Sequence, residues 1–188
     1  MSFFIFYKIN DDFTMQITQQ MTTQQVIGFP PLLAGKNEEV RILVLGSAPS
    51  VKSLEMQQYY GHPRNVFWWI MGQLFNFDHQ VSYPKRQKLL SQNGVILWDV
   101  LESCERTGSL DSAIQTESEL ANDIPMLLNH YQSIGQIACN GGAAMRLLKK
   151  HHSQLFDGDY EVMQMPSTSP AYATISKEQK LEQWSQLK

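Results

Sequence analysis

Four apolar segments recur along the chain and determine its expected architecture. The first, residues 42–46, reads ILVLG, and an apolar run without alternation suits a parallel strand that is covered on both faces. The other three occupy residues 95–101, 134–141 and 161–166. We expect all four segments to be strands of one sheet.

Helix-like stretches separate these strands. They occupy residues 63–75, 84–92, 117–131, 142–155 and, after the last strand, 176–187. Pro63 and Pro84 suit the first turn of a helix, and Ser176 with Gln179 has the pattern of a capping box. The alternation of strand and helix implies right-handed crossovers. It predicts an α/β protein, a three-layer α/β/α sandwich with a central four-stranded parallel sheet.

Length and composition favour one folded unit. With 188 residues and 43% hydrophobic content the chain can bury one substantial core. We expect residues 28–188 to form a single domain and residues 1–27 an irregular N-terminal extension, since residues 8–25 are glutamine-rich and show no sustained period. The apolar run at residues 3–7 falls far short of the roughly 20 residues of a membrane helix, so we expect no membrane span.

Charge and cysteine content narrow the expected partners. The formal net charge of -3 gives no general attraction to nucleic acid, so any contact with DNA must rely on local clusters and backbone amides. The two cysteines, Cys104 and Cys139, suggest neither a disulfide framework nor a metal site. We expect a cytoplasmic monomer without metal or organic cofactor.

The most unusual stretch of the chain, residues 46–68, directly follows the first strand. It opens with a small polar turn, Gly46-Ser-Ala-Pro-Ser50, at the carboxyl end of that strand, which is where open α/β sheets bind ligands. The paired rings Tyr59 and Tyr60 follow, and then the run His62-Pro-Arg-Asn65. Such a density of aromatic rings is unusual in a solvent loop. The stretch predicts a base pocket beside a phosphate-binding turn.

These residues resemble a known family. The turn at residues 46–50, the run Tyr59-Tyr-Gly-His-Pro-Arg-Asn-Val-Phe-Trp68 and the later Pro166-Ser-Thr-Ser-Pro-Ala171 resemble the uracil-DNA glycosylase superfamily. Within it they are most similar to the hypoxanthine-DNA glycosylase branch, also called DNA-deoxyinosine glycosylase. The resemblance covers residues 28–188 as a single glycosylase domain. It implies an enzyme that cuts the bond between a deaminated base and its sugar in damaged DNA and leaves an abasic site.

An enzyme of this kind must take the nucleotide out of the base stack. Extrusion costs a few kcal/mol, and stacking of the base on an aromatic ring returns about 1 to 3 kcal/mol. Tyr60, Trp68 and Phe75 are the candidate rings, and the sequence does not distinguish between them.

Asn65 is the principal catalytic candidate. Its amide offers a donor and an acceptor, so it can orient a water toward the sugar carbon or bond the leaving base. In the resembled branch an asparagine at this motif position is the important catalytic group. The structural alternative is that Asn65 only satisfies backbone groups at the start of a helix.

His62 and Ser169 complete the expected catalytic set. His62 is a candidate to protonate the base, or else it bonds the nearby turn, and Ser169 is a modest hydroxyl donor. Many members of the wider superfamily carry an acidic residue or asparagine at the position of Ala48, and histidine within the segment occupied by Ser167-Thr-Ser-Pro170. These departures remove the usual water activator and oxyanion donor, and they argue against efficient removal of uracil.

The remaining candidates for contacts with substrate or DNA lie mostly on the two motifs. They are Gly46, Ser47, Ala48, Pro49, Ser50, Ser53, Tyr60, Arg64, Phe75, Asn140, Ser167, Thr168, Pro170, Ala171 and Tyr172. Serines in a turn often bond their own backbone instead, and Arg64 can pair with a surface carboxylate as well as a phosphate. Tyr172 is a candidate wedge for the space that the base vacates, or it packs on Pro170. Asp99 either orders water in the pocket or caps the next turn.

The sequence therefore predicts a monofunctional glycosylase that removes hypoxanthine from DNA with water as nucleophile. A uracil-specific or mismatch-specific glycosylase would use the same pocket with other base contacts. A catalytically weak nucleic-acid-binding module of the same fold is the alternative from another class, because Ala48 and Ser167 supply little proton chemistry.

Overall fold

The structure is a computed structural model that describes residues 23–35 and 38–187. Its strands are β1 (Gln24–Ile27), β2 (Ile42–Gly46), β3 (Val95–Asp99), β4 (Leu101–Arg106), β5 (Leu120–Ala121), β6 (Gln136–Asn140) and β7 (Glu161–Met165). Its α-helices are α2 (Val51–Met56), α3 (Phe67–Phe75), α4 (Tyr83–Gln92), α5 (Ile124–His130), α6 (Gly142–His151) and α7 (Lys177–Trp184). Four short 3-10 helices are η1 (Asp111–Ala113), η2 (Thr116–Ser118), η3 (Ser153–Phe156) and η4 (Ser185–Leu187).

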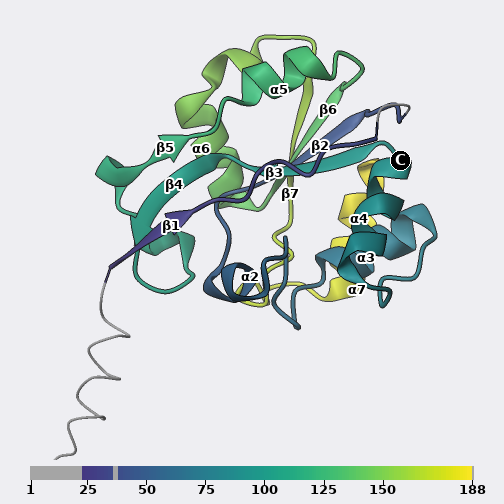
Figure 1. Ribbon diagram of the computed structural model, residues 1–188, viewed down its shortest axis with the longest axis horizontal. Coiled ribbons are helices and arrows are strands. Elements are labelled where there is room, and N and C mark those ends of the chain that lie inside the picture. The colour runs from purple at the N-terminus through teal and green to yellow at the C-terminus, as the bar shows by residue number, and fades with distance from the viewer. Residues whose placement is uncertain (1–22, 36–37, 188) are drawn as a thin grey trace, which may run out of the picture.

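The central sheet has four parallel strands in the order β3-β2-β6-β7, and this confirms the predicted sheet. Helices cover both of its faces, with α5 and α6 on one side and α3, α4 and α7 on the other (Figure 1). Side chains of β2 alternate between the two resulting cores. Leu43 and Leu45 pack with α5 and α6, whereas Ile42 and Val44 pack with α3, α4 and α7. The predicted three-layer sandwich is therefore confirmed.

A second, antiparallel sheet was not expected from the sequence. Its order is β1-β4-β5, and β1 pairs with β4 from Gln24 opposite Arg106 to Ile27 opposite Ser103. Residues 24–27 were expected within the irregular extension, and that boundary is wrong because Val26 is buried and its backbone is paired. The rest of the extension, residues 1–22, lies outside the described residues.

Two helices begin later than predicted for local reasons, the helix expected over residues 142–155 ends at His151, and α2 was not predicted. The helix expected over residues 63–75 begins only at Phe67, because residues 62–65 form a hydrogen-bonded turn. The helix expected over residues 117–131 begins at Ile124. Asp123 caps it by accepting a hydrogen bond from the Met126 amide, and the more polar residues before Asp123 form η2 and β5.

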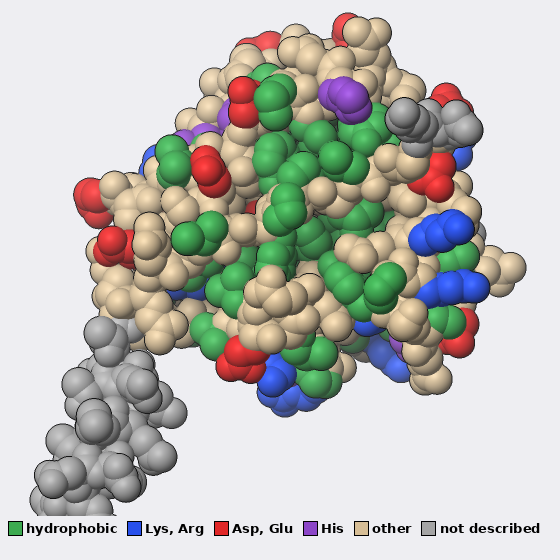
Figure 2. All heavy atoms as spheres, in the orientation of Figure 1, with side chains coloured by type: hydrophobic (Ala, Val, Ile, Leu, Met, Phe, Trp, Pro, Cys, Tyr) green, Lys and Arg blue, Asp and Glu red, His purple; other side chains and the backbone are tan. Residues whose placement is uncertain are grey.

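Apolar and positively charged side chains are unevenly distributed over the surface. On the face shown in Figure 2, apolar side chains form a band across the middle, and Lys and Arg side chains gather toward the right and the bottom. Among the described residues, no helix is both long and apolar enough to cross a bilayer.

Candidate active site

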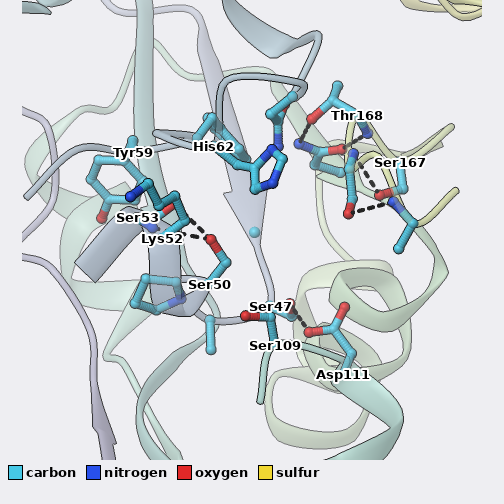
Figure 3. Close-up of a pocket in the computed structure, with 18 of the residues that line it drawn as sticks. Ser47, Ser50, Lys52, Ser53, Tyr59, His62, Ser109, Asp111, Ser167 and Thr168 are labelled. Atoms are coloured by element: carbon cyan, nitrogen blue, oxygen red, sulfur yellow. Dashed lines mark hydrogen bonds between the residues drawn. The ribbon is translucent and has the colours of Figure 1, made fainter. Parts of the chain in front are cut away.

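A pocket of about 400 Å³ opens at the carboxyl edge of the parallel sheet (Figure 3). The segments that follow β2 and β7 contribute to its wall, together with the last residues of β3 and β6, Asp99 and Asn140, as the topology of a parallel sheet favours. The predicted site residues that line it are Gly46, Ser47, Ala48, Pro49, Ser50, Ser53, Tyr60, His62, Arg64, Asn65, Asn140, Ser167, Thr168, Ser169, Pro170 and Ala171. The two motifs, which are far apart in sequence, therefore meet in one cavity.

The serines of the first loop are mostly used for structure. Ser50 caps α2 by accepting a hydrogen bond from the Ser53 amide at 3.1 Å, and the Ser53 hydroxyl oxygen accepts one from the Gly61 amide at 3.2 Å. The Ser47 hydroxyl donates to the carboxylate of Asp111 at 2.6 Å. The backbone-bonding alternative is therefore realised for Ser50 and Ser53, whereas Ser47 bonds a distant side chain. All three hydroxyls hold the loop in place beside the pocket.

The second loop is anchored to β6 by a reciprocal pair of hydrogen bonds. Asn140 Nδ2 donates to Thr168 Oγ1, and Asn140 Oδ1 accepts from the Thr168 amide, both at 2.9 Å. Next to them Gly141 has a φ of 99°, and a Cβ at this position would lie 2.9 Å from the Ser167 Cβ. Asn140 thus positions the loop, and its contact with the base stays a prediction, since Nδ2 has a second hydrogen and the residue lines the pocket.

The position of Asn65 is compatible with both of the roles weighed for it. Its Oδ1 accepts a hydrogen bond from the Phe67 amide at 2.9 Å, which stabilises the start of α3. Its Nδ2 makes no hydrogen bond within the described part of the chain, and the residue lines the pocket together with Ser169. The acceptor end of the amide is structural, and the donor end remains available.

His62 lies between the two loops. In Figure 3 its imidazole projects toward the space between the first-loop serines and Ser167 with Thr168. Its Nδ1 accepts a hydrogen bond from the Arg64 amide at 3.1 Å, so a neutral imidazole carries its proton on Nε2. The turn-bonding alternative and a place in the pocket are therefore compatible for this residue.

The aromatic candidates are separated by the fold. Tyr60 lines the pocket and stacks on Phe67, with ring centroids 4.0 Å apart. Phe75 packs instead against the core on the α3 side, and Trp68 is buried with its indole N–H donating to the Tyr59 carbonyl at 2.9 Å. The expectation that Phe75 contacts the base is wrong, because its place at the end of α3 turns it toward the core. Phe29, which was not predicted, lines the pocket.

Tyr172 lies outside the pocket wall. Its side chain is 39% exposed, and the ammonium of Lys180 lies 5.1 Å from its ring centroid while donating to its backbone carbonyl. Its proposed contact with DNA stays a prediction.

Asp99 is the most unusual group in the pocket. It is 3% exposed, its Oδ2 is buried without a hydrogen-bond partner, and no described residue bonds its carboxyl group. The pKa of Asp99 is raised to about 7, chiefly because burial disfavours the charged carboxylate and secondly because Asp111 lies near, while Arg106 acts in the opposite direction. The capping alternative does not apply. The place of Asp99 at the end of a strand was the sequence signal for it.

The approach of Asp99 depends on Gly46. The two residues are paired across β2 and β3, and a Cβ at position 46 would collide with the Asp99 carboxylate. Gly46 therefore leaves room for a carboxyl group to reach the pocket floor. No described group of His, Cys, Asp or Glu residues has an arrangement that could hold a metal ion.

The comparison with known families decides the class of this site. A family model described as the uracil DNA glycosylase superfamily matches residues 34–188. The chain belongs to the uracil DNA glycosylase superfamily. This membership confirms the resemblance stated from the motifs and identifies an enzyme, a DNA glycosylase, whose substrate is DNA.

Relatives of this glycosylase are similar over most of their length. It is 36% identical over 156 residues to a hypoxanthine DNA glycosylase of Methanosarcina acetivorans, covering 82% of this chain and 93% of the relative. It is 36% identical over 115 residues to a hypoxanthine DNA glycosylase of Methanosarcina barkeri, covering 61% and 70%. The solution NMR structure of a Methanosarcina acetivorans protein, described as a candidate uracil DNA glycosylase, matches with a TM-score of 0.73 and 34% identity, over 87% of this chain and 96% of that one.

Proposed function

We propose that this glycosylase removes hypoxanthine from DNA by hydrolysing the N-glycosidic bond of a flipped deoxyinosine. The observation that carries the proposal is that one cavity combines the free amide donor of Asn65 with the buried, unpartnered carboxyl group of Asp99. The two relatives at 36% identity that are named hypoxanthine DNA glycosylases support the same substrate.

The dimensions of the pocket suit a single flipped nucleoside. Its volume of about 400 Å³ lies within the range of small-ligand sites, which is roughly 300 to 1,000 Å³. Tyr60 in its wall supplies an aromatic surface for the base, and such stacking offsets part of the few kcal/mol that extrusion costs.

Asp99 gives the pocket a means to distinguish a deaminated base from adenine. Hypoxanthine carries an imino hydrogen at N1, which an ionised carboxylate accepts. Adenine presents a lone pair at N1, which the same carboxylate repels. A buried acceptor that is bonded only when the correct base enters favours that base, because the wrong base leaves it unpaired.

The remaining groups act on the bond that breaks. Water attacks C1′ of the sugar, the C1′–N9 bond breaks, and its electron pair leaves with the base. Asn65 Nδ2 donates either to this departing base or to the attacking water, which it orients. The Ser169 oxygen accepts from the Ala171 amide at 3.2 Å, which leaves the hydroxyl hydrogen free to donate to charge that develops on the base. The base gains a proton, and the proton of the water passes to solvent.

Single-turnover excision on matched duplexes tests the substrate. Duplexes that differ only in carrying deoxyinosine, deoxyuridine or deoxyxanthosine are incubated with excess enzyme, and abasic sites are read as alkali-labile breaks. We expect deoxyinosine to react fastest. Uracil is a possible competitor because it also has an imino hydrogen that Asp99 can accept. Fastest release of uracil would therefore identify a uracil glycosylase. Tight binding without any alkali-labile product would indicate a binding module.

We also infer a cytoplasmic monomer with one glycosylase domain. Cys104 and Cys139 are both buried and unpaired, which suits a reducing compartment. Both core clusters pack on the same central sheet, which supports a single domain. Sedimentation velocity tests the oligomeric state. Limited proteolysis tests the domain boundary, and the stable fragment should begin near β1.

A further inference from the structure

A second cavity of about 460 Å³ lies beside the pocket and shares part of its wall. The shared residues are Tyr60, His62, Arg64 and Asn65. Beyond them, Trp69 of α3, His79, Arg86 of α4 and Lys177 of α7 line the cavity. We call this second cavity the cationic groove.

The charge of the groove is one-sided. Its lining includes Arg64, Arg86 and Lys177 together with two histidines, and it contains no Asp or Glu. This contrasts with the formal net charge of -3 of the whole chain. Lys177 forms an ion pair with Glu178, with 3.8 Å between Nζ and Oε1. Because both side chains are exposed, this ion pair cancels little of the positive charge of the groove. An anion is the ligand that this lining suits.

Aromatic rings hold two of the cations in place. The guanidinium carbon of Arg86 lies 5.0 Å from the centroid of Trp68, and the ammonium of Lys177 lies 4.6 Å from that of Trp69. Arg86 Nη2 donates to Gln58 at 3.3 Å, and its Nε is buried with no hydrogen-bond partner. A ring face orders a cation without cancelling its charge, so donors remain available for a bound anion.

We propose that the cationic groove binds the sugar-phosphate backbone of the damaged strand next to the flipped nucleotide. The inference rests on the proposed function, since it places a DNA nucleotide in the adjoining pocket. A strand that leaves the pocket across Arg64 and Asn65 enters the groove directly, because these residues belong to both cavities. Arg86 and Lys177 then contact its phosphates. Phosphate contacts carry no sequence information, so the groove adds affinity without preference for the flanking bases.

The test measures binding without chemistry. The double variant Arg86→Gln/Lys177→Gln is titrated against a duplex that carries a stable abasic-site analogue, at several salt concentrations. We expect affinity to fall about tenfold. The slope of log K against log salt should fall in magnitude by about 2, roughly 0.9 for each phosphate that the variant no longer neutralises. The decrease in affinity should be equal in two different flanking sequences.

Matched controls separate a local interaction with phosphate from a general decrease in positive charge. Lys88→Gln/Lys149→Gln removes two exposed positive charges that lie outside both cavities, and it should leave binding near the wild-type level. Arg86→Lys keeps the charge and should retain most of the affinity. The exposed Lys177→Gln alone, which leaves the Arg86 interactions intact, should lower the salt slope by about 1 even if the double variant folds poorly.

Three results would overturn the inference. They are an unchanged affinity and salt slope in Lys177→Gln, an equal decrease in affinity in the Lys88/Lys149 control, and a decrease that depends on the flanking sequence. Because the probe is not cleaved, these results are independent of excision. A wild-type enzyme that binds through the groove but releases no hypoxanthine would refute the proposed function and leave the groove standing.

Discussion

The two cavities that meet at Asn65 are similar in volume and differ in their charged groups. The floor of the pocket holds Asp99, a buried carboxyl group, whereas the lining of the cationic groove holds three cations and no carboxylate. A neutral base needs hydrogen bonds in a site where water is excluded, and an anionic backbone needs positive charge at the surface. If the two proposals hold, recognition of the base and attachment to DNA rest on different residues on either side of a shared wall, so variants should remove one without the other.

The largest expected effect is on the pocket side of this comparison. Asn65→Ala should lower the single-turnover rate of base excision by at least about 100-fold, comparable to the loss of one well-placed catalytic hydrogen-bonding group. DNA affinity should change little, because the groove remains. An unaltered single-turnover rate would remove Asn65 from the mechanism.

A second variant at this position distinguishes the two roles of Asn65. Asn65→Asp keeps the acceptor for the Phe67 amide and so preserves the start of α3, but it removes the donor. Loss of excision with an unchanged thermal midpoint would show that Asn65 acts through its amide donor. Retained excision would show instead that its task is to orient water, which a carboxylate also performs.

The next largest effect concerns Asp99. Asp99→Asn should slow hypoxanthine excision by about 10- to 100-fold, because a good base-edge contact contributes about 1 to 3 kcal/mol to discrimination. In the wild type the single-turnover rate should rise as pH increases through about 7, where the raised pKa lets the carboxyl group ionise and accept the imino hydrogen. The variant should lack this rise. A pH profile identical in both proteins would exclude a role for this carboxylate.

The third largest effect concerns the groove. The Arg86/Lys177 double variant should bind DNA with about tenfold lower affinity. If that variant lost excision at saturating DNA as strongly as Asn65→Ala, the separation between base recognition and DNA attachment would fail.

We expect Asp99→Asn to have the opposite effect on stability to its effect on excision. In the unfolded chain the pKa of Asp99 is about 3.9, and in the folded protein burial raises it to about 7. The folded state therefore holds the extra proton between these values, and the free energy of unfolding falls as pH rises through this window. Asp99→Asn removes this pH-dependent decrease. It should unfold at higher denaturant concentration than the wild type at pH 8, and the difference should shrink toward pH 4.

The smallest effect is expected at Phe75. Phe75→Leu should change the excision rate by less than about twofold and lower stability by about 1 kcal/mol, since the ring packs against the core outside the pocket. A large loss of excision with normal stability would place Phe75 in contact with DNA after all.

Sequence-based predictions succeeded where a property depends on one segment of the chain, and failed where it depends on how side chains are oriented in the folded structure. The first strand was predicted because an uninterrupted apolar segment indicates burial on both faces, a property of the segment by itself, and β2 is buried throughout. The parallel sheet followed from the alternation of four apolar segments with helix-like stretches. The motif at residues 46–65 and Ser169 were placed in one pocket because parallel strands end at the same edge of a sheet. Predictions failed where orientation mattered. Phe75 has the right residue type, but the helical phase of α3 directs it to the core.

The pattern of apolar residues and the two loop motifs thus determined, without coordinates, the layered architecture and the edge at which the site forms. Only the tertiary structure placed Asp111 against Ser47, brought Asp99 beside Gly46 and assembled the cationic groove from α3, α4 and α7. Pairing of β1 with β4 was decided in the same way. The physical reason is that local sequence specifies backbone conformation and burial, whereas the chemistry of a cavity depends on side chains that meet only after distant segments have packed.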